Sequence, residues 1–92
     1  MITARIQEVA LAILAGLSSA GSSPLSEAIV HARANLKLRH AGNEPALQSE
    51  FTDALAWLDT SRHVIGTRGP LGNARWSIST AGRHLLADES PA

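Results

Sequence analysis

Apolar residues recur at the 3.6-residue spacing of an amphipathic helix in three successive segments before residue 62. The first segment runs from Ile2 to Leu17, with Thr3 as its N-cap. The second begins at Ser23-Pro24, where the serine would cap the helix and the proline would occupy its first turn. The third begins by the same logic at Glu44-Pro45 and ends near residues 60–62. The positions that we expect to be buried are Ile6, Val9, Ala10, Ile13, Leu14 and Leu17, then Leu25, Ile29, Ala32 and Leu36, then Leu47, Phe51, Ala54, Leu55 and Leu58.

The pattern changes to strands and turns after residue 62. His63-Val64-Ile65 is short and β-branched, and residues 75–79 alternate with the period of two that is typical of a strand. The connection between them is rich in turn-forming residues, namely Gly66, Gly69, Pro70, Gly72 and Asn73. These features predict a two-stranded β-hairpin, followed at residues 80–86 by a short helical turn that places Leu85 and Leu86 on the core. We therefore expect an α+β domain at residues 1–87 and a flexible C-terminal tail at residues 88–92.

Composition narrows the classes of protein to which the chain can belong. Its 92 residues correspond to one domain, and a hydrophobic content of 45% is ordinary for a globular protein. Because aromatic residues make up only 3%, the core must consist mainly of alanine, leucine, isoleucine and valine. The sequence has no cysteine, which excludes disulfides and a cysteine nucleophile and favours a cytoplasmic location.

The N-terminal segment also permits a second interpretation. Arg5, the apolar run 9–17 and Ser18-Ser19-Ala20 loosely resemble a secretory signal peptide. However, Gln7 and Glu8 interrupt the approach to the apolar run, and the amphipathic period favours a helix of the domain. No apolar run reaches the roughly 18 residues of a membrane span, so we expect no membrane partner.

The formal net charge is zero, but the charges are segregated along the chain. Arg33, Lys37 and Arg39 cluster late in the second predicted helix. Residues 44–61 contain four acidic residues and no lysine or arginine. The next stretch has only positive charges, at Arg62, Arg68, Arg75 and Arg83. Two basic regions are therefore candidates for phosphate contacts, and an acidic helix lies between them in sequence.

The C-terminal segment Trp76-Ser77-Ile78-Ser79-Thr80-Ala81-Gly82-Arg83-His84-Leu85-Leu86 resembles the ending that many winged helix-turn-helix domains carry after the wing. Residues 51–58 followed by Val64-Ile65-Gly66 are similar to the third helix of such a domain entering the wing. More narrowly, the pattern resembles the N-terminal domain of Mrr-type restriction endonucleases. The resemblance implies a winged helix, with a three-helix core, a two-stranded wing and a short C-terminal helical turn. It also implies that Trp76 packs under the wing and that Gly82 permits a close approach.

The same resemblance implies a non-enzymatic DNA-binding domain, a small transcriptional regulator or a DNA-reading module of a larger assembly. In the family, the third helix usually enters the major groove of double-stranded DNA and the wing contacts the phosphates or the minor groove. The third helix would then offer Gln48, Ser49 and Thr52, and also Asp53. The wing and the second helix would offer Arg68, Asn73, Arg75, Arg33, Lys37 and Arg39. The chain departs from the family in its acidic third helix, which is poorly suited to lie between phosphates.

A protein-interaction role is the competing hypothesis. Zero net charge and the acidic third helix favour a winged helix that binds a protein partner or forms a homodimer without binding DNA. Trp57 lies off the middle of the third apolar stripe, so it is either an anchor for such a partner or a residue at the edge of the core. If the basic residues converge on one face and the acids point away from it, DNA is favoured; acids within the basic face favour a protein.

Catalytic and metal sites are not expected. The four histidines, at residues 31, 40, 63 and 84, lack the mutual spacing of metal ligands. Gly66, Gly69 and Gly72 have neither the dinucleotide spacing nor the lysine of a phosphate-binding loop. Since no serine, histidine and acid can be assigned to a triad, we expect no enzyme activity, no cofactor, no metal and no small-molecule substrate.

Overall fold

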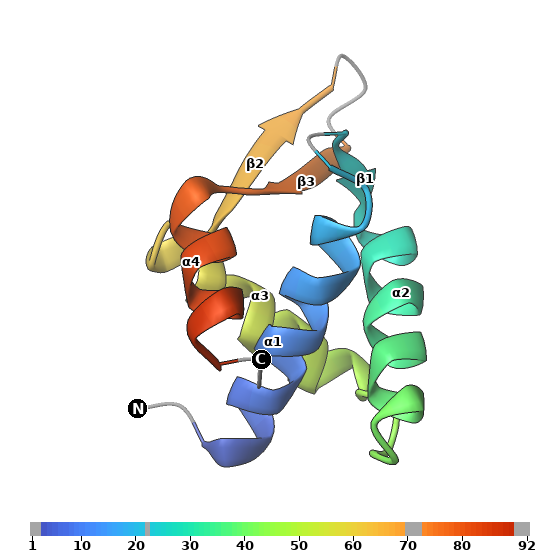
Figure 1. Cartoon of the computed structure of the whole chain (residues 1–92). Helices are drawn as coiled ribbons and strands as arrows, with labels where there is room; N and C mark the ends of the chain where they lie inside the picture. The colour runs from blue at the N-terminus through green and yellow to red at the C-terminus, as the bar shows by residue number, and fades with distance from the viewer. Residues whose placement is uncertain (1–2, 22, 70–72, 90–92) are drawn as a thin grey trace.

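The computed structural model of the chain describes residues 3–21, 23–69 and 73–89 (Figure 1). In these residues it is an α+β structure with four helices and a three-stranded antiparallel sheet. The elements are α1 (Ala4–Ser18), β1 (Leu25–Ser26), α2 (Glu27–His40), α3 (Gln48–Thr60), β2 (Val64–Arg68), β3 (Ala74–Ile78) and α4 (Thr80–Glu89). Of the residues with sequence-based predictions, Ile2, Ser22, Pro70, Gly72 and residues 90–92 lie outside the described part.

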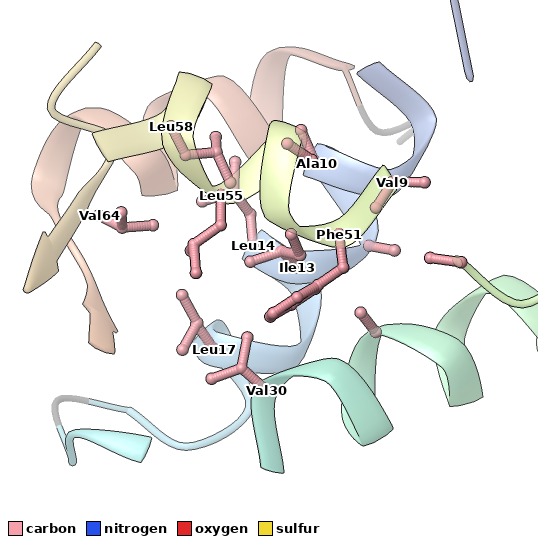
Figure 2. Close-up of a cluster of buried hydrophobic side chains, with 14 of the residues drawn as sticks. Val9, Ala10, Ile13, Leu14, Leu17, Val30, Phe51, Leu55, Leu58 and Val64 are labelled. Atoms are coloured by element: carbon pink, nitrogen blue, oxygen red, sulfur yellow. The ribbon is translucent and has the colours of Figure 1, made fainter. Parts of the chain in front are cut away.

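Helix α1 lies at the centre of the molecule and packs against α2, α3 and α4. Its predicted face is confirmed, because Val9, Ala10, Ile13, Leu14 and Leu17 are all buried (Figure 2). Ile6 is partly buried and packs against the same cluster. Its predicted cap is also confirmed, since Oγ1 of Thr3 accepts the backbone N–H of Ile6 at 3.1 Å. The strongest periodicity in the sequence thus corresponds to the helix around which the other elements assemble.

The predicted face of α2 is wrong. Ile29 and Leu36 are 47% and 51% exposed and Ala32 is exposed, whereas Val30, Ala34 and Leu38 are buried. The helix also begins later than predicted, with Ser26 rather than Ser23 as its N-cap, because Leu25 and Ser26 pair with β3. Since α2 carries apolar residues on both faces, helical spacing alone could not decide which face turns inward.

A glycine in α1 helps to set the inward face of α2. Gly16 is buried, and a Cβ atom there would lie 3.0 Å from Cβ of Arg33. The missing side chain therefore lets the two helices approach closely at this level. Gly16 does not end the helix, which continues to Ser18.

Helix α3 starts at Gln48, later than the predicted Glu44-Pro45. The backbone of the preceding loop is held by side chains instead of helical hydrogen bonds. Asn35 Oδ1 accepts the N–H of Ala46 at 2.8 Å, and Nε2 of His31 donates to the Ala46 carbonyl at 2.9 Å. The predicted core residue Leu47 is 67% exposed in this loop. The rest of the predicted face is confirmed, since Phe51, Ala54, Leu55 and Leu58 are buried (Figure 2).

Arg5 ties the start of α1 to the start of α3. Its Nε and Nη2 donate to the two carboxylate oxygens of Glu50 at 3.1 and 3.2 Å, and Nη2 also donates to the Glu44 and Pro45 carbonyls. Glu50 in turn accepts the backbone N–H of Leu47 at 2.9 Å, which satisfies a free donor at the helix start. The hydrogen bonds from Arg5 and then from Leu47 hold the pKa of the Glu50 carboxyl below its ordinary value.

This pairing predicts a specific response to acid. Because the folded-state pKa of Glu50 is lowered, its contribution to stability is complete above the unfolded-state pKa and is lost as the pH falls through the folded-state pKa. Glu50→Gln should therefore reduce the loss of thermal stability between about pH 5 and pH 2, measured by circular dichroism. Asp53→Asn is the matched control, since it removes a carboxylate from the same helix without touching Arg5. An acid response in Glu50→Gln equal to that of the parent would contradict the assignment.

The predicted hairpin is confirmed, with Val64 paired to Ile78 and Gly66 paired to Trp76. Strand β1 was not predicted from the sequence. Its two residues pair with β3, Leu25 opposite Trp76, and give the strand order β1-β3-β2. This third strand fastens the hairpin to the start of α2 (Figure 1). The Trp76 ring packs against the buried cluster and over its strand partner Gly66, where a Cβ atom would lie 2.8 Å from Cζ3 of the ring.

The C-terminal element is longer than predicted. Helix α4 continues to Glu89, so Asp88 and Glu89 are helical and the expected boundary at residue 87 falls inside a helix. Oγ of Ser79 accepts the N–H of Gly82 at 3.1 Å and donates to the Arg62 carbonyl at 2.7 Å, which fixes the start of α4 on the end of α3. In the described part of the chain, no helix has the length and apolar character needed to cross a membrane.

Candidate nucleic-acid interface

Three of the predicted DNA contacts lie together beside the turn of the hairpin. Arg68, Asn73 and Arg75 are exposed and line one surface depression with Ser26 and Glu27. Strand pairing places them at the end of the sheet that projects away from the helices (Figure 1). Within the described residues, neither arginine has a carboxylate within 4.0 Å, so both guanidinium groups are available to an anion.

Although both arginines border this depression, strand alternation places them on opposite faces of the hairpin. Arg68 is paired with Ala74 and shares the sheet face of Trp76, two residues further along β3. Arg75 is paired with Thr67 and lies on the other face, where Oγ1 of Thr67 donates to its carbonyl at 3.5 Å. An elongated anion that passes the end of the hairpin would therefore meet a guanidinium group on each side.

The basic residues of α2 do not join this cluster. Nη1 of Arg33 donates to Oγ of Ser19 at 3.0 Å, so this side chain extends toward the end of α1. Lys37 lines a separate depression with residues of α1 and Leu86. Arg39 is exposed in the last turn of α2, about 18 Å along the helix from Glu27. The five basic residues proposed as DNA contacts therefore do not gather on one face.

Arg83 is likewise engaged elsewhere in the molecule. Its Nη2 donates to the carbonyl of Gly21 at 3.0 Å, which joins α4 to the segment after α1. This residue belongs to the all-positive stretch of the sequence, yet its hydrogen bond is structural. The basic surface of the hairpin is thus narrower than the run of charges suggested.

The outer side of α3 carries acids and no base. Gln48, Ser49, Thr52 and Asp53 are exposed, and Nε2 of Gln48 donates to Oγ1 of Thr52 at 3.4 Å. Glu50 is turned away toward Arg5, but Asp59 lies on the side of α3 that faces Trp76. One of the acids therefore lies between the third helix and the hairpin.

A groove runs between α3 and the sheet. It has a volume of about 230 Å³ and is lined by Glu27, Phe51, Thr52, Leu55, Ala56, Asp59 and Trp76. The groove could not be predicted from the sequence, because its two acids and its tryptophan come from three different elements. Glu27 of α2 and Trp76 of β3, for example, are 49 residues apart in the chain.

No protein-family model matches this chain, and no curated protein matches it.

Trp57 belongs to the edge of the core. It is half-buried and packs against the buried cluster, and its ring lies beside His63 with a centroid distance of 5.7 Å. Of the two roles that the sequence left open for Trp57, this position favours the structural one. The tryptophan that lines a groove is instead Trp76.

The histidines have separate surroundings. His31 is stacked on Phe51 with ring centroids 4.4 Å apart and planes 9° apart, and it holds the loop before α3. His63 lies beside Trp57, and its Nδ1 is buried without a hydrogen-bond partner in the described structure. Across the described residues, no three histidine, aspartate or glutamate side chains form a group that could hold a metal ion.

Proposed function

We propose that the chain is a non-enzymatic winged-helix domain that binds double-stranded DNA through its hairpin. The main observation that supports DNA binding is the group of exposed residues Arg68, Asn73 and Arg75, which line one depression at the projecting end of the sheet. The winged-helix assignment is supported by three packed helices followed by a β-hairpin, and by the resemblance at residues 76–86. A small regulator or the DNA-reading module of a larger assembly is the setting in which such a domain would act.

The hairpin, and not α3, makes the main contact in this proposal. Duplex DNA presents a dense row of phosphates, and each arginine that neutralises a phosphate releases bound counterions. Arg68 and Arg75 can make such contacts from both sides of the hairpin, and the Asn73 amide adds a hydrogen-bond donor. Asp53 and Asp59 would repel the phosphates on either side of a groove entered by α3. Gln48, Ser49 and Thr52 therefore remain outside the principal contact.

Replacing both hairpin arginines should flatten the salt dependence of DNA binding. For Arg68→Ala combined with Arg75→Ala, we expect the slope of log K against log salt to fall by about 2, roughly one per lost phosphate contact. Fluorescence anisotropy with a labelled duplex from about 20 to 200 mM salt measures this slope. Both side chains are exposed, so thermal stability should change by less than about 0.5 kcal/mol.

Arg39→Ala is the matched control for the hairpin variant. This arginine is also exposed, but it lies at the far end of α2 from the hairpin. It should leave the slope unchanged if the hairpin alone carries the phosphate contacts. Absence of binding by the parent chain at low salt would refute DNA binding altogether, and an equal effect of Arg39→Ala would refute the assignment to the hairpin.

A protein-interaction module is the second candidate, favoured by the acids between α3 and the hairpin. Asp59 and Glu27 lie where a DNA-reading surface would need neutral or basic groups. A winged helix that binds a protein or a second copy has no such requirement. Light scattering over a range of concentrations separates a homodimer from a monomer, and a monomer at all concentrations would exclude self-association as this function.

A further inference from the structure

The groove between α3 and the sheet has an apolar floor and an acidic rim. Phe51, Leu55, Ala56 and Trp76 supply apolar surface, and Thr52 supplies a hydroxyl. Glu27 contributes a carboxylate from the first turn of α2, and Asp59 contributes one from the last turns of α3. The two charges thus come from different helices and lie on one small concave surface of about 230 Å³.

The position of the indole ring is held from two directions. Nε1 of Trp76 donates to Oε1 of Glu27 at 3.2 Å, and the ring lies against Gly66, where no side chain intervenes. Glu27 therefore orients the aromatic wall of the groove while keeping its second oxygen available within the described structure. Asp59 has no hydrogen bond or ion pair with any other described side chain. A ligand would thus meet a fixed aromatic wall and two carboxylates that retain free acceptor oxygens.

Charge and shape together define the ligand class. An aliphatic stem would cover the apolar floor, and a cationic head would pair with the carboxylates and lie against the indole. The planar guanidinium group suits this combination better than an ammonium group, because it stacks on aromatic rings and donates two parallel hydrogen bonds to a carboxylate. From this geometry we infer that the groove binds an arginine side chain presented by a basic segment of a partner protein.

This site is distinct from the proposed DNA contact, although Glu27 borders both depressions. Phosphates approaching the groove would meet two carboxylates and no described cationic side chain lining it. Arg68 lies on the same face of the sheet as Trp76, but it lines the neighbouring depression at the turn of the hairpin. The domain could therefore hold DNA at the hairpin and a basic protein segment in the groove, and each activity can fail without the other.

The two tryptophans allow a direct test by nuclear magnetic resonance. The indole N–H of Trp76 is followed in the ¹⁵N-labelled chain during titration with N-acetyl-arginine amide. We expect a saturable shift with a Kd on the order of 1–10 mM, as befits one solvent-exposed side chain. The indole of Trp57, which packs beside His63 at the edge of the core, should not shift. N-acetyl-citrulline amide has the same length but no charge and should give no saturable shift.

Two matched substitutions on α3 locate the binding site. Asp59→Asn should weaken binding of N-acetyl-arginine amide about three- to fivefold, the value of one exposed ion pair. Asp53→Asn removes the same charge from the same helix outside the groove and should leave the Kd unchanged. Both residues are exposed, and a thermal melt of each variant verifies that the fold is kept.

Three outcomes would overturn the inference. The first is equal binding of the arginine and citrulline amides, and the second is an equal effect of the two aspartate substitutions. The third is that a duplex oligonucleotide shifts the Trp76 indole signal and binds the Asp59→Asn variant more tightly than the Asp53→Asn variant. That result would make the groove part of a DNA-binding surface. The salt slope of the hairpin variants is measured separately, so a failure of DNA binding is distinguishable from a failure of this site.

Discussion

Replacing Leu38 by alanine should lower the free energy of unfolding by about 2–5 kcal/mol, whereas the same replacement at Leu36 should change it by less than about 0.5 kcal/mol. Leu38 is 2% exposed and belongs to the core cluster, so its truncation removes buried methyl groups and leaves a cavity. Leu36 is 51% exposed and loses little on truncation. Since a domain of this size is stable by only about 5–15 kcal/mol, the first change is a large fraction of the total.

The two leucines form an unusually close comparison. They lie two positions apart on α2, so the substitution and its helix propensity are the same and only burial differs. Urea denaturation followed by circular dichroism gives both free energies by linear extrapolation. A larger loss at Leu36 than at Leu38 would mean that α2 turns its other face inward. Equal losses would mean that both faces of the helix are buried, as in a complex with another copy of the chain.

Burial on α1 and α3 could be predicted because each helix has one apolar face. On α1, the residues spaced from Val9 to Leu17 are buried as expected, and on α3 the same holds from Phe51 to Leu58. Helix α2 offers two apolar stripes, one through Ile29 and Leu36 and one through Val30 and Leu38. Its orientation depends on tertiary features, namely the pairing of Leu25 and Ser26 with β3 and the close approach at Gly16.

The same distinction separates the two parts of the candidate site. Arg68, Asn73 and Arg75 lie within one hairpin, so strand pairing at short sequence distance was enough to predict that they gather. The groove depends on Glu27, Asp59 and Trp76, which come together only through helix packing and the third strand. The pattern of charges along the sequence also could not predict that Arg33 hydrogen-bonds to Ser19 and Arg83 to Gly21. Both hydrogen bonds join segments that are brought together only by the tertiary fold.

Gly82→Ala should destabilise the domain by about 2 kcal/mol or more, although glycine-to-alanine changes inside helices normally stabilise by up to about 1 kcal/mol. Gly82 is buried in the first turn of α4, against the segment that leaves α3. A Cβ atom there would overlap the carbonyl oxygen of His63 and lie 2.9 Å from Cγ1 of Ile78. The His63 carbonyl cannot easily move, because it accepts the N–H of Ser79 at 3.1 Å. The steric overlap should therefore make this glycine-to-alanine substitution destabilising, whereas such a substitution in a helix is usually stabilising.

The measurement is a thermal melt of Gly82→Ala beside Ala81→Gly, which exchanges the same two residue types at the adjacent, exposed position. Ala81→Gly should cost at most about 1 kcal/mol, the propensity difference alone. Gly82→Ala should lower the melting temperature by about 10 °C, given the usual 4–8 °C per kcal/mol for a domain of this size. An unchanged or higher melting temperature in Gly82→Ala would show that α4 does not pack this closely on His63.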